Sequence, residues 1–152
     1  MAGEFLHIEG SVENILFKNP VNGYIVLDLD AGGELIPVFG NLGDIEEGEV
    51  LILEGNYTTS QKYGTQFKAE YCERKLPENA VNIEKYLASG AIKGIGPGLA
   101  KKIVNMFGAA SLEIIENNTY RLSEIKGISR KKCEEIAEEA KKLFSLRAVT
   151  SF

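Results

Sequence analysis

The spacing of hydrophobic residues changes near the middle of this chain of 152 residues. Before Leu76, short apolar stretches alternate with polar residues, as in strands that bury one face. After Asn82, apolar residues recur every three or four positions, as in amphipathic helices. Pro77 lies at the change, and a proline ends a strand because it cannot donate to the ladder. The pattern predicts an α+β protein with two domains, residues 1–77 and residues 78–152.

The first half predicts five short strands separated by turns. We expect them at residues 5–17, 24–29, 35–39, 49–57 and 66–71. Gly10 lies inside the long first strand, where a glycine predicts a β-bulge. Five short strands favour a small closed barrel, because closure removes exposed strand edges. An OB-like barrel is the expected fold, and an SH3-like barrel, which has a similar pattern, is the alternative.

The second half predicts an all-α domain of short helices followed by a long one. An apolar face at residues 83–87 belongs to the first helix. A second apolar stripe over residues 99–107 ends at Gly108, which we expect to be a C-terminal cap. Ser111 is expected to cap a short helix that runs to Asn117.

One turn occurs twice in this half. Residues 92–100 (IKGIGPGLA) align with residues 125–133 (IKGISRKKC), and downstream Ile103 aligns with Ile136. Each copy predicts a helix, a tight turn and a second helix that begins near lysines. Two such copies in register are far more specific than a single Gly-Ile-Gly turn. We therefore predict a tandem helix-hairpin-helix domain.

Each predicted turn has the features of a phosphate site. Gly94 and Gly127 can adopt a positive φ and leave the backbone open to a phosphate oxygen. Gly96 in one copy and Ser129 in the other cap the next helix. The free N–H groups and the positive dipole end of that helix then face an anion. Such a site recognises phosphate and not bases, so binding should be independent of sequence and sensitive to salt.

The predicted nucleic-acid site includes the turns, the isoleucines that anchor them and the neighbouring basic residues. Ile95 and Ile128 are expected to point inward. The complete set is Lys93, Gly94, Ile95, Gly96, Gly98, Lys101, Lys102, Lys126, Gly127, Ile128, Ser129, Arg130, Lys131 and Lys132.

The second copy has a structural alternative. Ser129 and Cys133 stand where the first copy has glycine and alanine. The Arg-Lys-Lys run could then be a solvated face balanced by glutamates. We expect these glutamates to lie beyond the first turn of the helix: Glu134, Glu135, Glu138 and Glu139.

Charge is divided unevenly between the halves. The net charge is −5, but residues 1–77 contain 5 Lys/Arg and 13 Asp/Glu, whereas residues 78–152 contain 12 and 9. The second half is therefore the expected binding half for a polyanion. OB barrels can stack bases on aromatic rings. In this acidic half, however, we expect the aromatic residues to serve core or interdomain packing, since large apolar side chains are usually buried: Tyr24, Phe39, Tyr57, Tyr63 and Phe67.

No catalytic or metal site is expected. His7 is the only histidine, and Cys72 and Cys133 belong to no CxxC pair. The acids of the loop at residues 44–47 have no positioned partner. Leu99 breaks a GxGxxG motif, and no GxxxxGK[ST] motif occurs. Neither a secretory signal nor an apolar run of about 20 residues is present, so we expect a cytoplasmic protein with reduced thiols.

Two stretches carry a family resemblance. Residues 62–67 (KYGTQF) and residues 83–97 (IEKYLASGAIKGIGP) resemble the N-terminal region of RecD-like ATP-dependent DNA helicases, a group similar to the exodeoxyribonuclease V alpha subunit. The helical half is also similar to the tandem hairpin domain of the Holliday-junction protein RuvA. The resemblance implies a DNA-binding accessory module used in DNA repair and recombination.

In that family the region precedes two motor domains that hydrolyse ATP with Mg²⁺. No motor motif occurs in this sequence. The resemblance therefore implies a fragment of a longer helicase that is not an enzyme by itself and needs no cofactor. Its expected partners are DNA and the missing motor domains.

A protein-interaction module is the alternative function. In that case the hairpins are structural and the acidic barrel docks a partner or the motor domains. Salt dependence separates the two hypotheses, because roughly two to four phosphate contacts give a log–log salt slope near −0.9 per contact.

Overall fold

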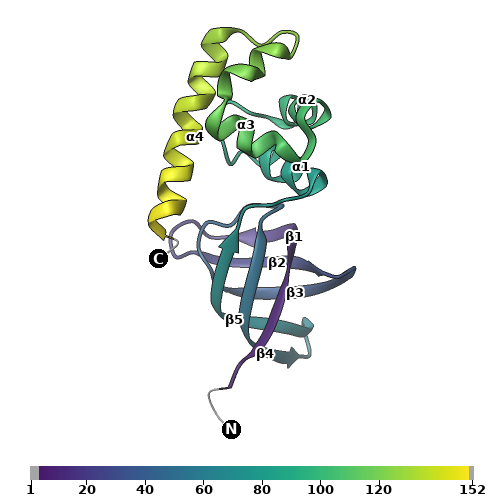
Figure 1. The fold of residues 1–152 in the computed structure, drawn as a ribbon. Coiled ribbons are helices and arrows are strands. Elements are labelled where there is room, and N and C mark those ends of the chain that lie inside the picture. The colour runs from purple at the N-terminus through teal and green to yellow at the C-terminus, as the bar shows by residue number, and fades with distance from the viewer. Residues whose placement is uncertain (1–3, 151–152) are drawn as a thin grey trace. The chain divides into compact units, whose positions relative to one another are not determined.

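The computed structural model describes the backbone of residues 4–150 and the side chains of residues 4–145. The chain forms two compact units, Met1–Pro77 and Glu78–Phe152. The described part of the first unit contains the strands, and that of the second contains the helices (Figure 1). The predicted α+β class, a barrel followed by helices, is confirmed.

The first unit is a closed barrel of five strands. They are β1 (Leu6–Lys18), β2 (Tyr24–Ala31), β3 (Glu34–Asn41), β4 (Val50–Ser60) and β5 (Gly64–Lys75). The strand order is β1-β2-β3-β5-β4, and β4 pairs with β1 to close the barrel. All neighbours are antiparallel except β3 and β5, which pair in parallel at Val38–Phe67 and Phe39–Lys68. This arrangement is an OB-fold.

Alternate residues of each strand fill the barrel. On β2, Ile25, Leu27 and Leu29 are fully buried, because successive side chains of a strand point to opposite faces. Val38 of β3 and Phe67 of β5 complete the same core. The barrel interior is therefore packed with side chains.

The bulge predicted at Gly10 is wrong. Gly10 pairs regularly with Leu51 of β4. The register shifts of β1 against β2 lie between residues 12 and 14 and between residues 15 and 17. A Cβ atom at Gly10 would lie 2.3 Å from the carbonyl oxygen of Asp30. The glycine is needed because two strands approach closely there.

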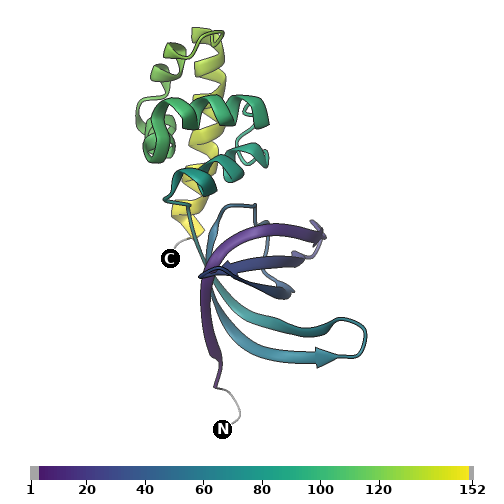
Figure 2. The same cartoon turned by 90° about the vertical axis from the view of Figure 1, so that its right-hand side faces the viewer.

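The second unit contains four α-helices and two short 3₁₀ helices among the described residues (Figure 2). They are α1 (Ala80–Ala88), α2 (Pro97–Phe107), η1 (Gly108–Ala110), α3 (Ser111–Asn117), η2 (Thr119–Glu124) and α4 (Arg130–Thr150). Ile83, Tyr86 and Leu87 of α1 are buried, as their spacing predicted. Gly108 follows the end of α2 with a φ of 56° and is the predicted C-terminal cap.

Ser111 does not have its predicted role. Ala110 is the N-cap position of α3, and Ser111 is the first residue of the helix. The Ser111 side chain is fully buried, and its hydroxyl donates to the carbonyl oxygen of Gly108 at 2.7 Å. The 3₁₀ helix η1 leads directly into α3, so no extended residue precedes the helix to act as a side-chain cap.

Across the described residues, no helix combines the length and the apolar character needed to cross a membrane.

Candidate nucleic-acid interface

The first predicted hairpin turn joins α1 to α2. The N–H group of Ile95 donates to the carbonyl oxygen of Ile92 at 3.1 Å, and Gly94 between them has a φ of 103°. Gly96 is the N-cap of α2 in extended backbone, and Pro97 begins the helix. Ile95 is only 3 % exposed, so it anchors the turn as predicted.

The second turn repeats this geometry before α4. The N–H group of Ile128 donates to the carbonyl oxygen of Ile125, again at 3.1 Å, and Gly127 has a φ of 93°. The Ser129 hydroxyl accepts a hydrogen bond from the Lys132 N–H at 3.1 Å, as an N-cap does. Ile128 is only half-buried, so its predicted inward position holds only in part. The preceding Ile125, 5 % exposed, is the more buried anchor of this copy.

Both helices after the turns begin with unoccupied donors. In each copy the first helical carbonyl bond is made four residues after the cap, from Ala100 to Gly96 and from Cys133 to Ser129. The N–H groups of the residues between are free of helical partners, as at any helix start. Pro97 has no N–H, and the Lys132 N–H is bonded to the Ser129 hydroxyl. Each copy therefore leaves two such donors open, those of Gly98 and Leu99 in the first and those of Arg130 and Lys131 in the second.

The side chain of Lys132 connects the surroundings of the two turns. A Cβ atom at Gly96 or Gly127 would meet nothing within 4 Å. A Cβ atom at Gly94 would lie 3.5 Å from the Lys132 Nζ and 3.6 Å from a side-chain carbon of Ile136. Lys132 follows the second turn in the sequence, yet its ammonium group lies beside the first turn. The start of α4 therefore lies beside the first turn.

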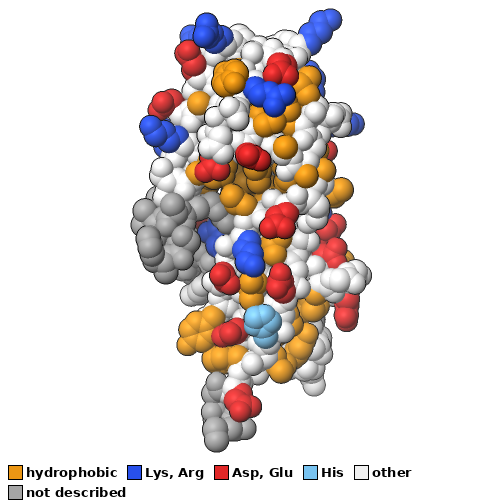
Figure 3. All heavy atoms as spheres, in the orientation of Figure 1, with side chains coloured by type: hydrophobic (Ala, Val, Ile, Leu, Met, Phe, Trp, Pro, Cys, Tyr) orange, Lys and Arg blue, Asp and Glu red, His pale blue; other side chains and the backbone are white. Residues whose placement is uncertain are grey.

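The basic residues around the two turns are available to an anion. Lys132 is half-buried, and the other predicted cations are exposed: Lys93, Lys101, Lys102, Lys126, Arg130 and Lys131. Within the described part of the chain, none of the seven lies in an ion pair. The first turn of α4 contains no acid, so the glutamates lie beyond it as expected. On the face drawn in Figure 3, most of the Lys and Arg side chains lie on the helical unit.

Two family models match the chain. Residues 6–77 match the OB-fold domain of the ATP-dependent DNA helicase YrrC, and residues 81–143 match the HHH domain of the ATP-dependent RecD2 DNA helicase. This chain matches the N-terminal region of RecD-like helicases. Its OB domain and its HHH (helix-hairpin-helix) domain are accessory domains, not catalytic domains, of such helicases.

The OB domain places its aromatic residues differently from the prediction. Phe67 is buried, and Tyr24 and Phe39 are half-buried, which agrees with packing. Tyr57 and Tyr63 are 46 % and 63 % exposed, so core packing is wrong for these two. They project because β4 and β5 continue as a hairpin beyond the strands that would cover them.

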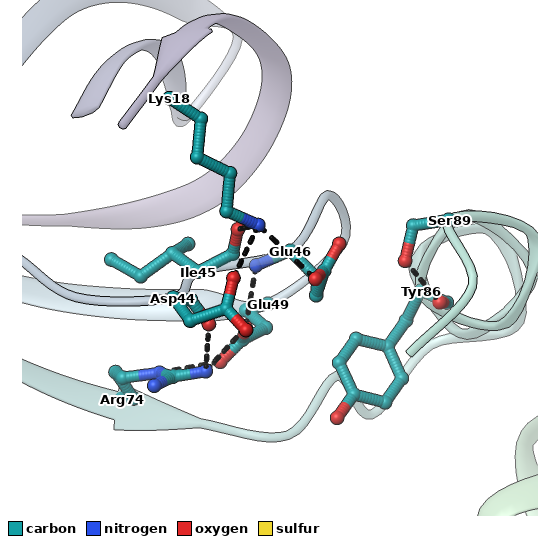
Figure 4. Close-up of polar contacts among 8 residues, drawn as sticks. All are labelled: Lys18, Asp44, Ile45, Glu46, Glu49, Arg74, Tyr86 and Ser89. Carbon is teal, nitrogen blue, oxygen red and sulfur yellow. Dashed lines mark hydrogen bonds and ion pairs between the residues drawn. The ribbon is translucent and has the colours of Figure 1, made fainter. Parts of the chain in front are cut away.

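A buried carboxylate lies at one end of the OB barrel (Figure 4). Glu49 is fully buried and accepts two hydrogen bonds from the Arg74 guanidinium, each of 2.9 Å. The backbone N–H of Glu46 donates to the same carboxylate at 2.7 Å. A buried charge of this kind is tolerated only when it is paired and hydrogen-bonded. The sequence pattern did not predict this ion pair, because Arg74 and Glu49 are distant in the sequence.

Lys18 holds the neighbouring loop of the OB domain (Figure 4). Its ammonium group contacts Asp44 at 2.6 Å and Glu46 at 3.1 Å, and it donates to the carbonyl oxygen of Ile45. Burial disfavours the charged lysine, but the bonds to the two carboxylates outweigh burial and raise the pKa of Lys18. The loop acids thus have a structural role as ion-pair partners.

The two cysteines of the described residues form no disulfide and are at least partly buried. Cys72 and Cys133 are free, and burial raises the pKa of the Cys72 thiol to about 11. A thiol with such a pKa remains protonated and unreactive near neutral pH. No group of three or more His, Cys, Asp or Glu side chains in this part of the chain could hold a metal ion.

Proposed function

We propose that the HHH domain binds the DNA backbone without base specificity, as an accessory module of an ATP-dependent helicase whose motor domains lie outside this chain. The observation that carries the proposal is the repetition of one turn geometry. Gly94 and Gly127 have nearly the same positive φ, and each turn is followed by a helix start that lacks acids in its first turn. Two such sites, with Lys132 following the second turn and its ammonium group beside the first, are suited to phosphates.

Electrostatics supports the same ligand. Seven cations surround the two turns and have no ion-pair partner among the described residues. Displacement of counterions from DNA by such cations favours binding at low salt. Backbone N–H groups and lysines contact phosphates but do not distinguish bases, so the site accounts for affinity without sequence preference.

The test is fluorescence anisotropy of labelled duplex DNA against the whole chain at several salt concentrations. We expect a log–log salt slope that corresponds to roughly two to four phosphate contacts, at about −0.9 per contact. The variant Gly94→Asp/Gly127→Asp should lose this binding, because it places carboxylates and strained φ angles in the turns. Circular dichroism should show that the variant remains folded.

A matched control is Gly32→Asp/Gly43→Asp in the OB domain. Gly32 and Gly43 also have positive φ angles of 66° and 93° and open surroundings. The control therefore repeats the charge change and the backbone strain away from the hairpins. Equal loss of binding in both variants would contradict a role for the turns.

A second candidate function is protein binding by the OB domain. Residues 1–77 carry 13 Asp/Glu against 5 Lys/Arg, which suits a basic partner or a basic face of the motor domains. Absence of duplex binding even at low salt would favour this candidate.

A further inference from the structure

The hairpin formed by β4 and β5 extends past the barrel. The two strands pair with each other as far as Ser60 and Gly64. In contrast, β1 pairs with β4 only as far as Gly55, and β3 pairs with β5 only at Phe67 and Lys68. Residues 56–66 therefore form a free two-stranded arm, which Figure 2 shows reaching beyond the other strands.

The arm differs in charge from the domain that carries it. Residues 1–77 have a net charge of −8, with 5 Lys/Arg and 13 Asp/Glu. Yet no Asp or Glu occurs between Glu54 and Glu70, a stretch that contains Lys62 and Lys68. Lys68 pairs with Glu70 at 3.7 Å, whereas Lys62 has no carboxylate partner among the described residues. The stretch between Glu13 and Asp28 also lacks acids, but its Lys18 is held by Asp44 and Glu46. The arm is thus an acid-free stretch of this domain whose unpaired lysine would attract a polyanion.

Aromatic rings stand on the same arm. Tyr57 contacts the buried Phe67 edge-on, with ring centroids 5.2 Å apart and planes at 82°. This contact holds the Tyr57 ring in place while leaving it 46 % exposed. Tyr63 at the tip is 63 % exposed, and the Lys62 ammonium lies 5.1 Å from its ring centroid. Two accessible rings and a lysine are therefore close in sequence on a projecting element.

Small polar side chains complete the surface of the arm. Tyr57 and Thr59 lie on one face of β4, because side chains alternate along a strand. Thr65 pairs with Thr59, and their hydroxyls are 3.1 Å apart. These hydroxyls, together with the tyrosine rings and the Lys62 ammonium group, are suited to a ligand that has both polar groups and planar rings. A protein partner would be better matched by a continuous apolar patch.

We propose that this arm binds single-stranded nucleic acid, with bases stacked on Tyr57 and Tyr63 and a phosphate near Lys62. Rings can stack only on unpaired bases, and stacking tolerates any base. A duplex hides those base faces, so the arm discriminates in favour of single strands. This site is separate from the hairpin turns of the HHH domain and does not depend on their role.

The test uses the whole chain in the Gly94→Asp/Gly127→Asp background, so that the hairpins do not contribute. The probe is a labelled oligothymidylate of about 16 nucleotides, near the upper site size of an OB-fold. We expect Tyr57→Ser/Tyr63→Ser to weaken binding roughly fivefold or more, the effect of losing stacking on at least one base. Tyr57→Phe/Tyr63→Phe should retain binding, because the rings remain.

The matched control is Tyr71→Ser/Tyr120→Ser, which removes two tyrosines of similar exposure outside the arm, 61 % and 68 %. Its affinity for oligothymidylate should be unchanged. Photo-crosslinking with a 5-iodouracil oligonucleotide should label Tyr57 or Tyr63. Crosslinking uses the unaltered arm, so its result does not depend on whether Tyr57→Ser/Tyr63→Ser disturbs the β4–β5 pairing.

Three outcomes would overturn the proposal: no oligothymidylate binding at low salt, equal weakening in the Tyr71/Tyr120 control, or crosslinks only outside residues 56–66. The proposal that the HHH turns bind the DNA backbone is tested separately. Its test is duplex binding by the unaltered chain and loss of that binding in Gly94→Asp/Gly127→Asp. Failure of one proposal therefore leaves the other measurable.

Discussion

At the scale of single residues, side chains act in places that their sequence positions do not suggest. Lys132 belongs to the second hairpin by sequence, but its ammonium group lies beside Gly94 of the first. Arg74 closes the barrel end by pairing with the fully buried Glu49. In both cases one charged group is positioned by an element other than its own. These two residues therefore lead to predictions about coupling.

Lys132→Ala should weaken duplex binding and reduce the magnitude of the salt slope by about 0.9, the effect of losing one phosphate contact. Its effect should be smaller in a Gly94→Asp background, because both changes alter the same site and neighbouring residues couple. Anisotropy titrations of the two single variants and the double variant measure this coupling. Lys141→Ala, an exposed lysine further along α4, is the control. Additive effects of Lys132 and Gly94 would show that they act at separate sites.

Arg74→Met should destabilise the OB domain by about 3 kcal/mol, because it leaves the buried Glu49 carboxylate without its cation. Urea unfolding followed by circular dichroism measures the change. Arg74→Met/Glu49→Met should recover part of the loss, since no buried charge remains. Lys142→Met removes the exposed pair with Glu139 and should change the unfolding free energy by less than about 1 kcal/mol.

At the scale of elements, the two helix-hairpin-helix turns have the same backbone geometry but differ in how the following helix begins. Gly96 gives α2 no side-chain cap, and Pro97 occupies the first helical position. Ser129 caps α4 through its hydroxyl. The same turn is thus compatible with two kinds of helix start. The departure of the second copy from the glycine pattern is accordingly a change of cap and not a loss of the motif.

Ser129→Ala should cost about 1 kcal/mol in stability, whereas Ser129→Gly, which copies the first hairpin, should cost only a few tenths. Thermal unfolding of the whole chain measures both values. Duplex affinity should survive in Ser129→Gly, because the turn and the open N–H groups remain. Ser123→Ala, an exposed serine in η2, controls for loss of a hydroxyl. A larger cost for glycine than for alanine would contradict the capping role.

At the scale of the whole molecule, the two proposed nucleic-acid contacts belong to different compact units. The HHH domain holds the phosphate-facing turns, and the OB domain holds the arm with its exposed tyrosines. Their chemistry differs, since one surface offers N–H groups and many cations and the other offers rings and one unpaired lysine. A helicase module built this way would hold a backbone and an unpaired strand through separate sites.

Expressed separately, residues 78–152 should bind duplex DNA with the salt dependence of the whole chain, and residues 1–77 should not. Residues 1–77 should instead bind oligothymidylate with a weaker salt dependence, because stacking adds affinity without displacing counterions. Anisotropy with both probes measures each fragment after circular dichroism has verified its fold. Duplex binding by residues 1–77 would contradict the proposal that the HHH domain makes the contacts to the DNA backbone.

The sequence by itself determined the features that depend on neighbouring residues. The alternation of apolar residues predicted the strands, and the repeat at residues 92–100 and 125–133 predicted two equal turns. Gly94 and Gly127 were identified because a positive φ is a local requirement. The cap at Ser129 was predictable for the same reason, since its bond to Lys132 spans three residues. The resemblance to RecD-like helicases also rested on such contiguous stretches.

Only the tertiary structure decided what depends on contacts between distant segments. Gly10 is a glycine because β2 approaches β1 there, and not because the strand bulges. Tyr57 and Tyr63 are exposed because strand pairing ends before the β4–β5 hairpin does. Lys132 reaches the first turn because the tertiary fold places the start of α4 beside Gly94. The spacing of apolar residues shows which face of a strand or helix is apolar. It does not show how far along that strand or helix a neighbouring element packs against it.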